Sequence, residues 1–124
     1  MDFLLVMIGG GLGAGLRHAT NLLAARLLGT AFPYGTLTVN ILGSALIGLL
    51  YGMFSTHAAW SHPLYLFLTT GFLGGYTTFS AFSLDAALLY ERGAARLAAF
   101  YVMLSVSAGI AALFAALLAA RYFF

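Results

Sequence analysis

The chain has 124 residues, of which 63% are hydrophobic and 6% are charged, and its formal net charge is +2. A soluble domain of this size has a large surface relative to its core, and five arginines with three acidic residues cannot cover that surface. We therefore predict an integral membrane protein in the lipid bilayer. The small net charge indicates no nucleic-acid partner, and the absence of cysteine excludes disulfides and thiolate metal sites.

Four stretches meet the length of about 20 apolar residues that a spanning helix requires. We predict helices over residues 3–28, 33–54, 64–90 and 95–120, with Pro33 at a helix start and Trp60 as an interfacial anchor in the connector 55–63. The first stretch lacks a basic leader region and a cleavage site, so we expect a retained helix. The connectors leave no room for a soluble module. We predict one transmembrane domain over residues 1–124 and no enzyme.

The few charges set a weak topological bias. The first and third connectors carry Arg26, Arg92 and Arg96, whereas the other side of the membrane offers Arg121. A bias this small permits insertion in both orientations, and therefore an antiparallel homodimer. Small residues recur at the four-residue spacing that lets membrane helices approach closely. These pairs are Gly9/Gly13, Gly11/Gly15, Gly48/Gly52 and Gly71/Gly75.

Two helices carry a polar stripe. On the second, Thr36, Asn40 and Ser44 follow one another at four-residue steps, and an amide at bilayer depth requires a partner or water. Asn40 therefore either bridges two helices or contributes to a polar path. On the fourth, Tyr101 and Ser105 share a face, and from the residues alone packing and function remain equally open for them.

The third helix holds a cluster over residues 71–83. Adjacent glycines followed by two threonines predict a break near Gly74 and Gly75, where freed carbonyls can coordinate a cation. Phe79 and Phe82 lie three residues apart and so share a face of the helix after the break. Aromatic edges are positive and suit a dehydrated anion. The alternative is that both rings simply face lipid or the core.

The placement of the charges favours an anion over a cation. The three carboxylates, Asp2, Asp85 and Glu91, lie at or near the ends of predicted spans, so no buried acid is present for proton-coupled cation export. The interior offers hydroxyl and amide donors together with Arg17. Donors of this kind replace the hydration shell of an anion.

With these motifs the sequence resembles the Fluc (CrcB) family of fluoride channels. The resemblance covers nearly the whole chain and rests on three blocks, at Gly9–Arg17, Pro33–Gly43 and Gly71–Ser83. It implies an all-α dual-topology antiparallel homodimer with two fluoride pores and passive export of cytoplasmic fluoride across the plasma (inner) membrane. Phe79 of one subunit and Phe82 of the other would line each pore.

The resemblance also implies roles for the remaining candidates. Asn40 would position the aromatic pair, and the carbonyls of Gly74 and Thr77 from both subunits would enclose a structural sodium ion. The other implied positions are Thr36, Tyr101 and Ser105 in a polar track, and Arg17 and Asp85 in a vestibule or structural role. The chain departs from the family at Gly109, where some relatives continue the track with a hydroxyl, and at Asp85, where relatives often carry glutamate.

Two other functions are weighed against a channel. A small multidrug resistance transporter also has four short helices, but it requires a glutamate in the first helix, where this chain has Arg17 and Arg26. The second alternative is a helical assembly partner that transports nothing.

Overall fold

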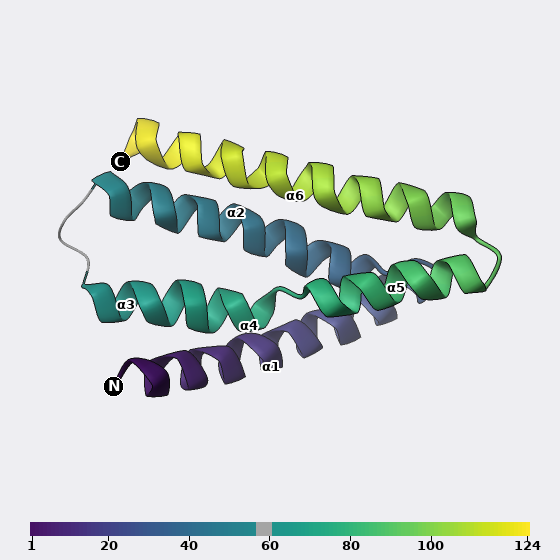
Figure 1. The fold of residues 1–124 in the computed structure, drawn as a ribbon, viewed down its shortest axis with the longest axis horizontal. Coiled ribbons are helices and arrows are strands. Elements are labelled where there is room, and N and C mark those ends of the chain that lie inside the picture. The colour runs from purple at the N-terminus through teal and green to yellow at the C-terminus, as the bar shows by residue number, and fades with distance from the viewer. Residues whose placement is uncertain (57–60) are drawn as a thin grey trace.

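The computed structural model describes residues 1–56 and 61–124, and within them the chain forms helices joined by short connectors, with no strand (Figure 1). The helices are α1 (Asp2–Leu28), α2 (Tyr34–Thr56), α3 (His62–Leu66), the π-helix η1 (Phe67–Leu73), α4 (Gly74–Tyr76), α5 (Phe79–Glu91) and α6 (Ala95–Phe123). We call the run from α3 to α5, residues 62–91, the broken column. It runs in the same direction as α1 and antiparallel to α2 and α6, and both termini lie at the same end of the bundle (Figure 1).

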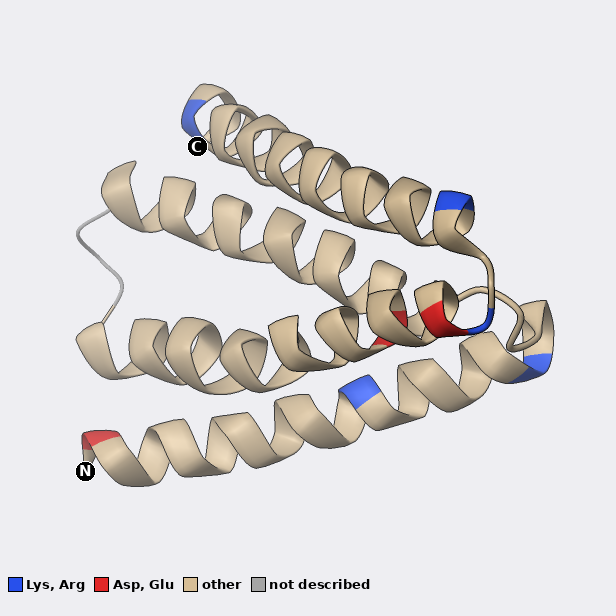
Figure 2. Cartoon of the chain, turned by 45° about the vertical axis from the view of Figure 1, so that its right-hand side comes forward, with Lys and Arg blue, Asp and Glu red and all other residues tan. Residues whose placement is uncertain are grey.

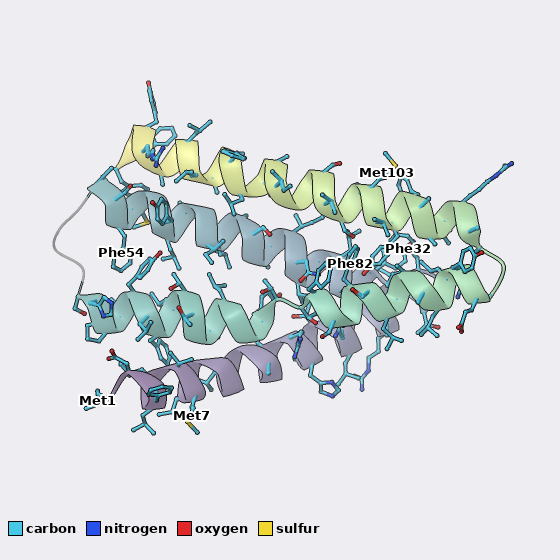
Figure 3. All side chains as sticks on the ribbon, viewed as in Figure 1. Met1, Met7, Phe32, Phe54, Phe82 and Met103 are labelled. Carbon is cyan, nitrogen blue, oxygen red and sulfur yellow. The ribbon has the colours of Figure 1, made fainter. Side chains whose placement is uncertain are left out.

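The predicted helix boundaries differ from the observed ones by at most three residues. Among the described residues, three helices, α1, α2 and α6, are long and apolar enough to cross a membrane. Their outward faces carry large apolar side chains, and Met7 and Met103 project away from the bundle (Figure 3). The chain is therefore a membrane protein, as composition predicted. Trp60, the proposed interfacial anchor, lies outside the described residues.

Glycines set how closely the helices pack. A Cβ atom at Gly13 would lie 2.0 Å from the carbonyl oxygen of Phe72, and one at Gly48 would lie 2.3 Å from a carbonyl of α6. In lipid the hydrophobic effect does not drive helices together, so helix association depends on close van der Waals packing of this kind. Gly11 and Gly15 differ, because they face open space. Three of the four predicted pairs are thus confirmed as packing sites: Gly9/Gly13, Gly48/Gly52 and Gly71/Gly75.

The break in the broken column lies later than the sequence indicated. The backbone is helical through Gly74–Tyr76 and becomes extended at Thr77 (φ −83°, ψ 160°) and Thr78 (φ −154°, ψ 121°). Gly75 stays helical because it packs on α1, where a Cβ atom would lie 2.3 Å from the carbonyl oxygen of Gly10. β-branched residues accept extended backbone readily. The prediction of a break was right, and its position near Gly74 and Gly75 was wrong.

Two tight connectors close the other end of the bundle. Gly29 follows α1 with φ 81°, and Gly93 follows α5 with φ 87°. Residues with a Cβ atom rarely adopt this left-handed backbone, so glycine permits both turns. The connectors bring the C-terminal ends of α1 and α5 next to the N-terminal ends of α2 and α6 (Figure 1).

Candidate functional site

The broken column is held at its break by one side chain of α2. The Nδ2 of Asn40 donates to the carbonyl of Thr78 (2.9 Å), and the amide of Thr78 donates to the Oδ1 of Asn40 (2.8 Å). The Thr78 hydroxyl also accepts from the amide of Ala81 (3.1 Å) and so caps α5. Asn40 therefore bridges two helices, one of the two alternatives left open by the sequence, and one of its two Nδ2 hydrogens remains for a further acceptor.

A cavity of about 330 Å³, which we call the break pocket, lies beside this contact. It combines an amide, four hydroxyl side chains and two aromatic rings at the point where the backbone is not helical. Non-helical backbone at membrane depth occurs where it is buried in protein or lines an aqueous cavity. Six of the predicted site residues line the pocket: Asn40, Gly74, Thr77, Phe79, Phe82 and Ser105.

The two phenylalanines occupy different environments. Their ring centroids are 5.6 Å apart with an interplanar angle of 48°. Phe82 is partly buried and contacts the ring of Tyr101 at 5.3 Å, and it lies inward in Figure 3. Phe79 is 79% exposed and belongs to the outer rim of the pocket. A single chain thus covers one ring and leaves the other open.

Tyr101 lies between Ser105, which lines the break pocket, and the side chains of Thr36 and Asp85. Its side chain is fully buried, and its hydroxyl donates to the Oδ2 of Asp85 (3.2 Å) and lies close to the side chains of Thr36 and Ser105. The hydroxyl of Ser105 is buried and has no hydrogen-bond partner among the described residues. The structure therefore brings the predicted polar track together, and it gives Asp85 a defined partner.

The backbone before the break loses a helical hydrogen bond. In a continuous helix the amide of Thr78 would donate to the carbonyl of Gly74, but here it donates to Asn40. Gly74 is exposed and Thr77 is half-buried in the single chain. Among the described residues no group of three or more His, Cys, Asp or Glu side chains lies close enough to hold a metal. The break itself presents backbone carbonyls and the hydroxyls of Thr77 and Thr78 as oxygen atoms.

Arg17 lies apart from the break pocket, on the other side of the broken column. It is half-buried in a second cavity of about 490 Å³, the α1–α5 pocket, which Asn21, Thr78 and Ser80 also line. No carboxylate of the described residues pairs with Arg17. Thr78 lines both cavities. We did not predict a role for Thr78, although a threonine directly before an apolar helix is a recognisable N-cap signal.

The comparison with known proteins decides the family. Residues 4–117 match the model of the CrcB-like protein family, Camphor Resistance (CrcB). The chain belongs to the CrcB-like family. A CrcB-like relative from Rhodopseudomonas palustris (strain BisB5), named fluoride-specific ion channel FluC, is 60% identical over 117 residues, which are 94% of each chain.

Two further CrcB-like relatives cover almost the full length. Fluoride-specific ion channel FluC 2 of Nitrobacter hamburgensis is 52% identical over 122 residues, or 98% of each chain. Fluoride-specific ion channel FluC of Agrobacterium fabrum is 48% identical over 124 residues, which are all of this chain and 99% of that one. The resemblance noted in the sequence is thus confirmed. These relatives are named as ion channels and not as enzymes.

Proposed function

We propose that this chain is a fluoride-selective channel that exports cytoplasmic fluoride passively across the plasma membrane. The proposal is supported by the names of its relatives and by the chemistry of the break pocket. The observation that carries it is the contact between Asn40 and Thr78, because this contact places an amide donor beside Phe79 and Phe82.

The pocket suits a small anion that must lose water and then leave again. The edges of Phe79 and Phe82 carry partial positive charge, and the free Nδ2 hydrogen of Asn40 and the hydroxyl of Ser105 are neutral donors. Several weak sites of this kind release an ion where a single strong charge would trap it. Beyond Ser105, the pathway continues along Tyr101 to Thr36 and Asp85. Fluoride flows down its gradient, which requires no energy-coupling site.

The proposed assembly is a dual-topology antiparallel homodimer with two pores. The exposure of Phe79 supports it, since an aromatic ring at the rim of a half-open pocket requires a second subunit to complete the site. In this assembly Phe79 of one subunit faces Phe82 of the other. Each subunit forms a single domain of four spanning helices, with the broken column as the third span. The break is tolerated because the pore and the partner cover it.

We place a structural sodium ion at the dimer centre. Its ligands are the carbonyls of Gly74 and Thr77 from both subunits, and the diverted amide of Thr78 supports this assignment by freeing the Gly74 carbonyl. Hard cations of this kind prefer oxygen ligands. Replacing sodium by choline in detergent solution should lower the melting temperature of the dimer. An unchanged melting temperature at vanishing sodium would remove the ion from the proposal.

Fluoride efflux from proteoliposomes, followed with an ion-selective electrode, tests the channel. The purified chain should release trapped fluoride within seconds of adding a potassium ionophore. Phe79→Ile and Phe82→Ile should each reduce the rate at least tenfold, because an aliphatic side chain has no positive edge. Phe114→Ile is the matched control, since Phe114 is 56% exposed on α6 and lies outside the pocket. Full efflux in both pore variants would refute the pore assignment.

A further inference from the structure

A third cavity lies where the two tight connectors meet. This connector pocket has a volume of about 570 Å³, and residues 29–36, the C-terminal half of α5 and Arg92 contribute to its wall. Thr36 and Asp85 also line it, and both belong to the cluster around Tyr101. The connector pocket therefore lies at the end of the polar track, at the end of the bundle where α1 and α5 end and α2 and α6 begin (Figure 1).

The pocket wall contains one side chain of each charge. Among its lining residues Arg92 is the only cation and Asp85 the only carboxylate, and the described residues form no ion pair between them. The Nη2 of Arg92 donates to the carbonyl of Ala31, which ties the connector after α5 to the connector after α1. A guanidinium carries five N–H donors, so most of them remain free in the pocket.

The carboxylate creates an electrostatic problem for an anion pathway. An anion leaving the Tyr101 cluster passes Asp85, and two negative charges a few ångströms apart repel strongly even in a partly aqueous pocket. A cation in the same wall offsets that repulsion. It also draws anions to the mouth from solution, because a charged cleft concentrates ions of opposite sign.

We propose that Arg92 is the anion-recruiting residue at the connector-pocket end of the fluoride pathway. This inference rests on the proposed channel function. One guanidinium against one carboxylate leaves the pocket near neutral, so fluoride is admitted and then released rather than held. The other arginines at this end of the bundle, Arg26 and Arg96, lie outside the pocket wall. Figure 2 shows that charged residues gather at this end.

A purely structural role for Arg92 is the competing explanation, since it ends α5 and bonds to Ala31. Chemical modification separates the two roles, because the natural chain contains no cysteine. A single cysteine at Arg92→Cys can be labelled in detergent with a cationic or an anionic methanethiosulfonate reagent before reconstitution. The same folded protein then carries either charge at one position, and no label restores the guanidinium fork that bonds to Ala31.

Arg96→Cys provides the matched control, since Arg96 is exposed in the first turn of α6 near Arg92. We expect Arg92→Cys to slow fluoride efflux roughly three- to tenfold at low ionic strength. The cationic label should restore most of that rate, and the anionic label should lower it further. The difference between the labels should shrink in 0.5 M inert salt. At Arg96→Cys both labels should change the rate by less than about twofold.

The possible failures are distinguishable. Equal effects of the two labels at Arg92, or equal effects at Arg92 and Arg96, would overturn the assignment while leaving the channel intact. Loss of efflux in Arg92→Cys that neither label changes would assign Arg92 to the structural role instead. Absence of efflux from the unmodified chain would contradict the proposed function itself.

Discussion

At the scale of single residues, Asn40 connects the fold to the site. Its amide pairs with both backbone groups of Thr78, in the way that a neighbouring strand would pair with an extended residue. No other side chain of the described residues makes this pair of bonds. The orientation of Phe79, one residue later, therefore depends on α2 as well as on the broken column. Asn40 therefore positions Phe79 and Phe82 indirectly, by fixing the backbone of Thr78 directly before them.

Replacing Asn40 by leucine should destabilise the protein and abolish fluoride efflux. The substitution leaves the N–H and C=O of Thr78 without partners, at a cost of about 2–4 kcal/mol for the two groups together. Unfolding in detergent by a denaturant series measures this loss. Thr38→Val is the matched control on the same helix, because the Thr38 hydroxyl bonds only to the carbonyl of Tyr34. A change below about 0.5 kcal/mol for Asn40→Leu would disprove the bracing role.

At the scale of elements, the broken column depends on α1. Glycines of α1 and of η1 and α4 bring the two backbones into contact, so α1 supports the segment directly before the break. The support is one-sided, because the opposite glycines of α1 face open space. Helix propensity alone would disfavour glycine at all of these positions. Close packing therefore explains why glycine stands at positions 9 and 13. At positions 11 and 15 no contact within the chain requires glycine.

Alanine at Gly13 should move the broken column away from α1. Its Cβ atom would meet the carbonyl oxygen of Phe72 at 2.0 Å, and overpacking of this kind costs about 1–3 kcal/mol. The melting temperature of Gly13→Ala should fall, together with the efflux rate. Gly11→Ala adds the same methyl group two residues away, where nothing lies within 4 Å, and should leave both values unchanged. Equal losses in the two variants would show that the contact with Phe72 is not the cause.

At the scale of the whole molecule, one chain leaves part of the candidate site exposed. Phe79 is 79% exposed and Gly74 is exposed, and both residues line the break pocket. In the proposed antiparallel dimer, the partner would supply the second ring of each pore and the second pair of carbonyls. Such a partner requires that the same chain inserts in both orientations. The sparse charges, with Arg26, Arg92 and Arg96 at one end and Arg121 near the other, allow this.

Dual topology predicts half labelling of either end of the bundle in intact cells. A cysteine at Glu91→Cys should react with a membrane-impermeant maleimide to about half the extent reached after permeabilisation, because half of the subunits present that end outside. Tyr122→Cys, near the opposite end, should behave in the same way. Full labelling at one site and none at the other would establish a single orientation and exclude the antiparallel dimer.

The sequence alone predicted the membrane environment, the helix boundaries, most glycine contacts and the family. These features follow from local composition and spacing, which lipid constrains strongly because every backbone group must be satisfied within its own helix. The predicted site residues also include six of the twelve that line the break pocket. In contrast, the break was predicted too early. Adjacent glycines are typical both of a helix break and of close helix packing. At Gly75 the contact with Gly10 of α1 shows that packing is the reason.

The tertiary structure alone decided which residues meet. Asn40 and Thr78 are 38 residues apart, and their pairing depends on how α2 crosses the broken column. Tyr101 reaches Asp85 across the packing of α5 on α6. Arg92 lines the connector pocket because two tight turns bring it to Ala31, 61 residues earlier in the chain. Sequence spacing specifies which face of a helix a residue occupies, but the neighbour opposite that face is set by packing between helices.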